Sequence, residues 1–258
     1  MINGQRVVVV MPAYNAARTI ERTWREVAGQ DVVDLVIVVD DASEDDTLAL
    51  ARSLDKVVAF GHASNRGYGA NQKTCYRLAL EHGADIVVML HPDYQYTPKL
   101  IPAMVGLVAS GLYPCVIGSR ILGGQALAGG MPWWRYVSNR ALTLVGNWLL
   151  GTKVSEFHTG YRAFSATLLR SLPLDRNSDD FVFDNEILAE VAWLGLPVGE
   201  VSCPTRYAAD ASSITFWRSV RYGSGCVATG LAYRFARWGL IRSARFPEQT
   251  SYNAPSPF

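Results

Sequence analysis

Short apolar runs that do not alternate with polar residues recur along the first 120 residues. The clearest of them is Val7-Val8-Val9-Val10, which is entirely β-branched. A strand of this kind is buried on both faces, as in a parallel sheet covered by helices on each side. We expect such strands over 6–11, 32–39, 56–61, 86–90 and 115–118. Helices are expected between them, over about 17–28, 43–54, 68–82 and 99–109. This alternation predicts an α/β fold with a mostly parallel sheet and right-handed crossovers.

The regular alternation stops after residue 120. Two glycine pairs, Gly123-Gly124 and Gly129-Gly130, mark a loop. Beyond it we expect helices over 131–150 and 185–194, strands over 161–164 and 198–203, and an aromatic, arginine-rich stretch over 216–245. The predicted organisation is a main domain over 1–214, a C-terminal amphipathic helical segment over 215–246, and a disordered tail over 247–258.

Composition excludes several classes of protein. The net charge of +1 gives no field to attract nucleic acid, so we expect no nucleic-acid partner. The N-terminal apolar run is too short for a signal peptide, and no window reaches the roughly 18 apolar residues of a transmembrane helix. The cysteines lack CxxC spacing, which favours buried thiols in a reducing compartment over a zinc site or disulfides. They are Cys75, Cys115, Cys203 and Cys226. We therefore expect a cytoplasmic protein.

The strand over 86–90 ends abruptly in a polar loop that carries His91, Asp93 and Gln95 and is closed by Pro98. The three polar residues stand at alternate positions, so an extended loop would point them the same way. Carboxylate, amide and imidazole donors suit a divalent cation, and such a cation usually accompanies a phosphorylated ligand. The alternative is an ordinary polar turn between a strand and a helix.

Polar clusters also follow the first two strands. Pro12-Ala13-Tyr14-Asn15 ends the first, and Asp40-Asp41 ends the second. We expect Asn15 to cap the next helix, and Ser43 with Asp46 to form a capping box for the one after. Because the carboxyl ends of parallel strands share one edge, these clusters should converge on a single crevice. The phosphate-binding motifs of P-loop ATPases and of dinucleotide-binding dehydrogenases are absent.

Five motifs in this order resemble the nucleotide-sugar-binding half of inverting family-two glycosyltransferases, and most of all the polyprenyl-phosphate (dolichyl-phosphate mannose synthase-like) sugar synthases. They are VVMPAYNA, VVDDASEDDT, NRGYGANQKT, MLHPDYQY and GSR. The resemblance covers roughly residues 6–215. It implies a Rossmann-like GT-A fold, hexosyltransferase activity in cell-envelope glycan synthesis, a UDP- or GDP-sugar donor, and a divalent cation, Mg²⁺ or Mn²⁺.

The resemblance also implies donor-site residues. Pro12, Ala13 and Tyr14, followed by Asn15, would line the base, and Asp40 would contact base or ribose with Asp41 beside it. Gly67 and Asn71 would lie behind the nucleoside and contact it. A cation bridging the diphosphate would neutralise charge on the departing nucleotide. Its ligands would be His91, Asp93 and Gln95, with Pro92 between them. His91 and Ala16 stand where the family usually has acids, which leaves a softer, weaker or metal-independent site open.

Other residues would serve the acceptor. Asp184 and Glu186 resemble an acidic helix start near the acceptor, although carboxylates at helix starts are also ordinary caps. The segment 157–164 resembles a family motif that reads acid, small residue, Gly, aromatic, Arg; His158 replaces its acid, and Arg162 is its arginine. An acceptor hydroxyl would need Asp184 as a general base, whereas a lipid phosphate is already an anion and needs cationic positioning. The arginines in question are Arg120, Arg135, Arg140 and Arg206; surface charge is the alternative role. Asp93, Asp184, Glu186 and Arg120 are the predicted catalytic residues.

Five of the seven tryptophans fall in 131–150 and 216–245, where aromatic residues interleave with arginine as in interfacial helices. Arg234 and Arg237 favour a surface-lying helix over a membrane span, and core packing is the rival explanation. We thus expect an inverting transferase acting on a polyprenyl (dolichyl or undecaprenyl) phosphate, peripheral at the inner membrane face. The alternatives are transfer to a saccharide hydroxyl and a catalytically silent nucleotide-sugar binder. The sugar, the nucleotide and the oligomeric state, a homodimer included, stay open.

Overall fold

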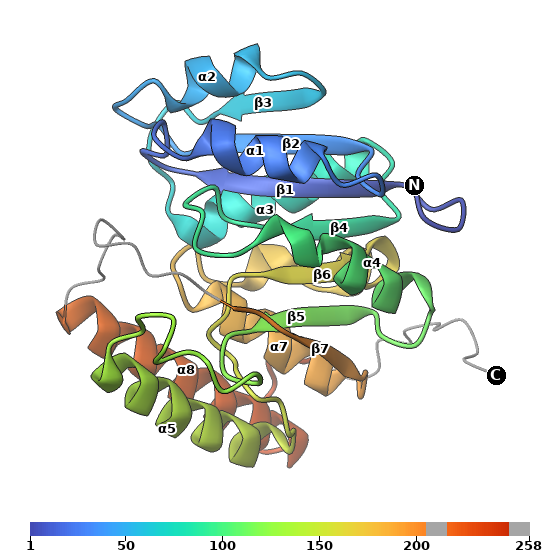
Figure 1. The fold of residues 1–258 in the computed structure, drawn as a ribbon. Helices are drawn as coiled ribbons and strands as arrows, with labels where there is room; N and C mark the ends of the chain where they lie inside the picture. Colours follow the sequence, from blue (N-terminus) through green and yellow to red (C-terminus); the bar gives the residue numbers. More distant parts are fainter. Residues whose placement is uncertain (205–215, 248–258) are drawn as a thin grey trace.

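The computed structural model describes residues 1–204 and 216–247, and its centre is one seven-stranded sheet (Figure 1). The strands are β1 (Val7–Ala13), β2 (Leu35–Asp40), β3 (Val57–Gly61), β4 (Ile86–Met89), β5 (Cys115–Ser119), β6 (Arg162–Ser165) and β7 (Val198–Ser202). Their order across the sheet is β3-β2-β1-β4-β6-β5-β7. In this sheet β6 runs antiparallel to both of its neighbours, β4 and β5, and the other neighbouring pairs are parallel. The predicted mostly parallel sheet is confirmed.

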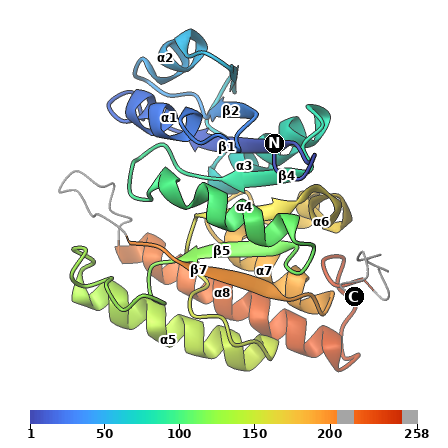
Figure 2. The ribbon, with the colours of Figure 1, turned by 45° about the vertical axis from the view of Figure 1, so that its right-hand side comes forward.

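Helices cover both faces of the sheet, as Figures 1 and 2 show from two directions. They are α1 (Ile20–Ala28), α2 (Thr47–Ser53), α3 (Tyr68–Glu81), α4 (Ile101–Ala109), α5 (Trp133–Leu150), α6 (Ala166–Ser171), α7 (Phe183–Trp193) and α8 (Phe216–Arg237). Short 3₁₀ turns η1 (Pro98–Leu100) and η2 (Leu174–Arg176) complete the described elements. The sequence pattern did not predict α6 or the two turns, which are only one or two turns long.

The valine run of β1 explains why the strands are apolar throughout. Val8 and Val10 point to one face and pack with α3, α6 and α7, whereas Val7 and Val9 point to the other and pack with α1 and α4. Both faces are therefore covered, and the four valines are completely buried. The four predicted buried thiols are confirmed as free and buried.

Helices α5 and α8 lie side by side beyond the β7 edge of the sheet (Figures 1 and 2). Helix α8 also packs on α7, and Tyr233 and Phe246 belong to the core cluster on that face. None of the described helices is both long and apolar enough to cross a bilayer. Apart from Pro247, the predicted disordered tail lies outside the described residues.

Two predicted helix caps are wrong. Helix α1 begins at Ile20, and Asn15, at φ 50°, instead accepts a hydrogen bond from the backbone of Glu44. Helix α2 begins at Thr47, and the hydroxyl of Ser43 binds Asp40 rather than a helix N–H. Both side chains tie the loops after β1 and β2 to each other, which local capping patterns do not reveal.

Candidate functional site

Five parallel strands and one antiparallel strand bring the predicted polar clusters to one edge of the sheet. β1, β2, β4, β5 and β7 share a direction, so their carboxyl ends lie at the same edge. β6 runs the other way, so the segment before it, 156–161, arrives at that edge too. The predicted convergence on one crevice is confirmed, and the antiparallel strand adds a segment that would otherwise lie at the opposite edge.

Asp41 organises the glycine loop that opens α3. Its Oδ1 accepts from the backbone N–H of Arg66 at 2.9 Å, and its Oδ2 accepts from the N–H of Gly67 at 2.9 Å. His62 Nδ1 lies 2.7 Å from the same Oδ1, and both side chains are almost fully buried. Asn71 donates from Nδ2 to the carbonyl of Val39 at 3.0 Å, which anchors the loop to β2. The structure thus brings Asp41, Gly67 and Asn71 together as predicted for the nucleoside side of the crevice.

Asp40 joins the loops that follow β1 and β2. It is 2% exposed, and its Oδ2 accepts from the backbone N–H of Ser43 at 3.0 Å. The hydroxyl of Ser43 donates to Asp40 and accepts from the N–H of Asn15. Tyr14, by contrast, is 52% exposed at the end of β1 beside Pro12 and Ala13. A contact of Asp40 with base or ribose stays a prediction, because both of its oxygens already have partners here.

The first turn of α3 packs against the loop before α7 too closely for a side chain at Gly69. A Cβ there would overlap the carbonyl oxygen of Ser178 and come within 2.9 Å of Phe183 Cβ. We expect Gly69→Ala to lower the unfolding free energy by about 1–3 kcal/mol, measured by urea denaturation. The control is Gly106→Ala in α4, where nothing lies within 4 Å of the added Cβ. That change should be neutral or slightly stabilising, and equal losses in the two variants would contradict the predicted steric cause.

The polar loop after β4 turns instead of extending. Tyr94 has φ 59°, and Asp93 Oδ1 accepts from the backbone N–H of Gln95 at 3.0 Å. The extended loop that would point His91, Asp93 and Gln95 the same way is therefore not formed. Asp93 is exposed, whereas His91 is half-buried with Nε2 3.0 Å from the hydroxyl of Tyr68.

The loop after β4 could bind a divalent cation only if a bound ligand supplied most of the coordinating oxygens. Within 1–204 and 216–247, no group of three or more His, Cys, Asp or Glu side chains is arranged to hold a metal. Asp93 offers an exposed carboxylate in the same loop as His91, while Asp40 and Asp41 are occupied by N–H and O–H donors. One or two protein ligands, with phosphate and water oxygens for the rest, is the usual arrangement for magnesium. The donor set suits a cation held mainly by a diphosphate.

Asp184, at the start of α7, lies at the same edge and is held on both oxygens. Its Oδ2 accepts from the Tyr68 hydroxyl at 2.6 Å, and its Oδ1 accepts from Gln72 Nε2 at 3.1 Å. Arg162 is fully buried, and its Nε lies 3.9 Å from Oδ1. Burial lowers the pKa of Arg162, but Asp184 together with the nearby Cys115, Tyr76 and Tyr68 more than offsets this, so the pKa ends above its ordinary value. The guanidinium is therefore a permanent cation next to Asp184.

Glu186 faces away from these contacts. Its Oε2 accepts from the backbone N–H of Ser178 at 2.6 Å, and its Oε1 pairs with Arg245 at 2.6 Å. It thereby ties the segment after α8 to the first turn of α7. These contacts give Glu186 a structural role, and its catalytic role stays a prediction.

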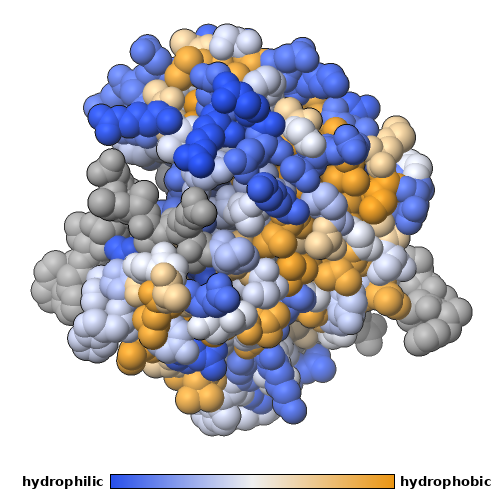
Figure 3. Space-filling model, viewed as in Figure 1, coloured by the Kyte–Doolittle hydropathy of each residue, from blue (hydrophilic) through white to orange (hydrophobic). Residues whose placement is uncertain are grey.

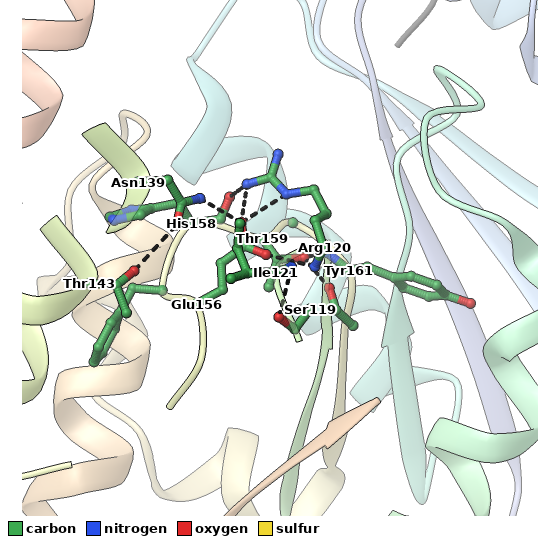
Figure 4. Close-up of polar contacts among 12 residues, drawn as sticks. Ser119, Arg120, Ile121, Asn139, Thr143, Glu156, His158, Thr159 and Tyr161 are labelled. Carbon is green, nitrogen blue, oxygen red and sulfur yellow. Dashed lines mark hydrogen bonds and ion pairs between the residues drawn. The ribbon is translucent and has the colours of Figure 1, made fainter. Parts of the chain in front are cut away.

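Arg120, directly after β5, is embedded in a buried network that Figure 4 shows. Its backbone N–H donates to Glu156 Oε2 and its Nε to Glu156 Oε1, both at 2.8 Å. Asn139 of α5 donates to the same Oε1 at 2.8 Å, and Arg120 Nη2 donates to the carbonyl of His158. Burial raises the pKa of Glu156, but Arg120 and the other donors more than offset it, so the pKa lies below its ordinary value. Glu156 is thus an anion with 0% exposure.

His158 links this network to α8. Its Nδ1 lies 2.6 Å from the hydroxyl of Tyr222. Burial lowers the pKa of His158 to about 4, so its ring is neutral at neutral pH. Its Nε2 is buried and has no hydrogen-bond partner in the described parts of the chain.

The other predicted phosphate-binding arginines are spread more widely. Arg140 is exposed and donates to the carbonyl of Ser155 at 2.8 Å. The Cζ of Arg135 lies 5.1 Å from the ring of Trp134. Arg206 lies outside the described residues. Arg120 and Arg140 thus both contact the 155–158 segment, and Arg135 lies in the first turn of α5.

Sequence reasoning missed several residues that shape the site. Those that hold a predicted residue by a side-chain contact are His62, Tyr68, Gln72, Glu156 and Arg162. Asn139 in turn donates to Glu156. His62, the residue directly after the third predicted strand, could have been suspected from its position. The partners of the others depend on contacts between distant segments, for which the sequence carries no signal.

The family model described as Glycosyl transferase family 2 matches residues 8–172. The UDP-N-acetylglucosamine–dolichyl-phosphate N-acetylglucosaminyltransferase of Methanococcus voltae is 28% identical over 217 residues, covering 78% of this chain and 86% of that protein. The polyprenol monophosphomannose synthase of Mycolicibacterium smegmatis is 26% identical over 245 residues, covering 92% of this chain and 88% of that protein.

Solved structures confirm the fold. Glucosyl-3-phosphoglycerate synthase from Mycobacterium tuberculosis, in complex with Mn²⁺, UDP and glucosyl-3-phosphoglycerate, has a TM-score of 0.68 and 22% identity. The match covers 93% of this chain and 82% of that one. A structure of the same enzyme with Mg²⁺ and UDP has a TM-score of 0.69. The expected GT-A fold is thereby confirmed.

Proposed function

Because the chain belongs to glycosyl transferase family 2, we propose that it moves one sugar from a nucleoside-diphosphate sugar to a polyprenyl phosphate, with inversion at the anomeric carbon. An oxygen of the acceptor phosphate forms the new bond to that carbon. The bond to the diphosphate breaks on the opposite face, and the nucleoside diphosphate leaves. Relatives named for transfer to dolichyl phosphate and to polyprenol phosphate support this acceptor class.

The donor would lie along the edge from β2 to β4. The glycine loop held by Asp41 would back the nucleoside, with Tyr14 exposed beside the base. Asp93 and His91 would hold a divalent cation, Mg²⁺ or Mn²⁺, together with the diphosphate, and the solved structures with either cation and UDP support this. That cation would neutralise charge on the leaving group.

The acceptor phosphate would meet arginines and needs no base. A phosphate is an anion at neutral pH, so the chain has only to position it, for which guanidinium groups are suited. Asp184 has both oxygens hydrogen-bonded and a buried arginine 3.9 Å away. A carboxylate so engaged is better placed to orient neighbouring groups than to take a proton. This supports a phosphate acceptor over a saccharide hydroxyl.

The observation that carries the lipid proposal is that α5 and α8 contact the site on one face and expose apolar side chains on the other. Their inner faces reach the site, since Asn139 of α5 holds Glu156 and Tyr222 of α8 holds His158. The outer face of α5 carries exposed apolar side chains along its length: Trp133 is 72% exposed, Leu144 71% and Trp148 74%. Figure 3 shows apolar side chains at the lower left, where Figure 1 places α5.

Charge on the same helices points to an anionic surface. Neither α5 nor α8 contains an aspartate or glutamate, and together they carry six arginines. On α8, Leu231, Phe235 and the following Trp238 are exposed next to Arg234. Apolar side chains flanked by arginine favour helices lying in the headgroup region of an anionic membrane. We propose that this pair of helices, the docking face, holds the enzyme peripherally at the inner membrane face, within reach of the lipid phosphate.

Removing two tryptophans from the docking face should separate membrane binding from chemistry. We expect Trp133→Ser with Trp148→Ser to weaken binding to vesicles of mixed phosphatidylcholine and phosphatidylglycerol by about tenfold per side chain, from the apolar burial lost. Vesicle flotation measures this. Transfer to a polyprenyl phosphate embedded in the vesicles should fall in parallel, while transfer to a short, water-soluble analogue should not change.

Leu112→Ser is the control, because Leu112 is 46% exposed in the turn between α4 and β5. That variant should float with vesicles as the unmodified protein does. Unchanged flotation of the double tryptophan variant would contradict the docking face. If light scattering showed that the double variant alone loses a dimer, the face would instead be an interface between copies of this chain.

A further inference from the structure

We propose that Tyr68 is a positioning residue for the donor's cation: its hydroxyl holds His91 with the proton on Nε2, which leaves Nδ1 as the cation ligand. The inference rests on the proposed function, because it concerns the cation that would accompany the diphosphate. It assigns a role to a residue on α3 that touches neither donor nor cation itself.

The hydrogen bonds of Tyr68 determine where the proton on His91 lies. The hydroxyl has one proton and donates it to Asp184 Oδ2 at 2.6 Å, because an ionised carboxylate can only accept. Its oxygen is also 3.0 Å from Nε2 of His91, and with its own proton committed it must accept there. Nε2 of His91 is therefore the donor. In the neutral ring the lone pair is then on Nδ1.

The phenol keeps its proton under ordinary conditions. Burial raises the pKa of Tyr68 well above its usual value, and the nearby charge of Asp184 raises it further. Gln72 and Arg162 hold Asp184 from its other side. The order of donors from His91 through Tyr68 to Asp184 is therefore set by the two hydrogen bonds of the Tyr68 hydroxyl.

Packing around the His91 imidazole also fixes its position. The ring of Tyr68 stacks on that of His91 with centroids 5.4 Å apart, and Phe181 packs on Tyr68 at 4.8 Å. Gly160 leaves room for the ring, since a Cβ there would lie 2.5 Å from Nε2. A carboxylate or a polar group behind a metal-binding histidine commonly sets which ring nitrogen binds, and its loss costs about 10–100-fold in metal affinity. Tyr68, backed by Asp184, has that relation to His91.

Two measurements on Tyr68→Phe test the inference. Nitrogen-15 NMR at pH 8, without metal, should show the His91 proton on Nε2 in the unmodified protein and a mixture of tautomers in the variant. The chain has four histidines, so His91→Gln assigns the signal. The affinity for Mn²⁺ in the presence of UDP or GDP, followed by electron paramagnetic resonance, should fall about 10–100-fold in Tyr68→Phe.

Tyr76→Phe is the matched control. Tyr76 is also buried on α3, but its hydroxyl donates to Gln72 at 2.8 Å. It should leave the His91 tautomer unchanged and weaken Mn²⁺ binding less than Tyr68→Phe does. A proton on Nδ1 of His91 in the unmodified protein would overturn the inference. So would the absence of Mn²⁺ binding with either nucleotide, or equal affinity in Tyr68→Phe and the unmodified protein.

These outcomes are separable from failure of the proposed function. Neither measurement uses a sugar donor or an acceptor. If sugar transfer to the lipid fails while the tautomer and the Mn²⁺ affinity behave as expected, the acceptor is wrong and the role of Tyr68 stands.

Discussion

Replacing Glu156 by glutamine is expected to lower the unfolding free energy by about 3–5 kcal/mol, the usual cost of removing one partner from a buried ion pair. The carboxylate is completely buried and accepts hydrogen bonds from Arg120 and Asn139. Glutamine keeps the shape, but its NH₂ group would face donors and Arg120 would lose its counter-charge. Urea denaturation at pH 7 measures the loss.

The effect of this substitution should depend on pH in a defined direction. The pKa of Glu156 is lower in the folded protein than its ordinary value of 4.5. Its ionised form therefore contributes stability that is fully present above pH 4.5 and is lost as the pH falls through the lower folded pKa. The gap in stability between the unmodified protein and Glu156→Gln should be widest near pH 7 and should narrow below pH 4.5.

Glu81→Gln is the control for this prediction, since Glu81 forms an exposed pair with Arg77 on α3. Its loss should change stability by no more than about 0.5 kcal/mol. If Glu156→Gln and the unmodified protein unfold at the same urea concentration, the buried pair with Arg120 does not stabilise the site as the geometry indicates.

Asp93→Ala is expected to lower kcat/KM for sugar transfer by about 10²–10³-fold, because a cation on the diphosphate contributes several kcal/mol to the departure of the nucleotide. Asp93 is the exposed carboxylate of the loop after β4, so its loss should leave stability nearly unchanged. Affinity for Mn²⁺ in the presence of UDP or GDP should fall with it. Steady-state kinetics and thermal unfolding measure the two effects.

Asp31→Ala, an exposed carboxylate between α1 and β2 at the opposite edge of the sheet, is the matched control. This variant should change neither kcat/KM for sugar transfer nor the affinity for Mn²⁺. If Asp93→Ala retained full kcat/KM at saturating Mn²⁺, the loop after β4 would not hold the cation.

The sheet was predictable because its strands are buried on both faces. The uninterrupted apolar runs of β1 and β4 predict strands that are buried on both faces. Parallel pairing of these strands then places their carboxyl ends at the same edge of the sheet. β6 was predicted as a strand, but its insertion between β4 and β5 in the opposite direction was not. Strand order depends on long-range pairing, and the four residues of β6 do not indicate whether the strand pairs parallel or antiparallel.

The site was predictable as a set of positions but not as a set of contacts. The ends of the strands and the family motifs placed Asp41, His91, Asp93 and Arg120 at one edge. The partners that determine their charge and orientation come from elsewhere in the chain: Glu156 is 36 residues from Arg120, and Asp184 is 116 from Tyr68. Such pairs form only when the fold brings the segments together, so local sequence patterns do not indicate them.

The most direct test of the account is the identity of the product. The protein would be incubated with a panel of UDP- and GDP-sugars, Mn²⁺ or Mg²⁺, and a short polyprenyl phosphate, and the organic phase analysed by mass spectrometry and NMR. We expect a sugar–phosphate–lipid of inverted anomeric configuration, with formation strongly reduced by EDTA and by Asp93→Ala. Transfer to 3-phosphoglycerate or to a saccharide with none to the lipid, or a lipid product of retained configuration, would contradict it.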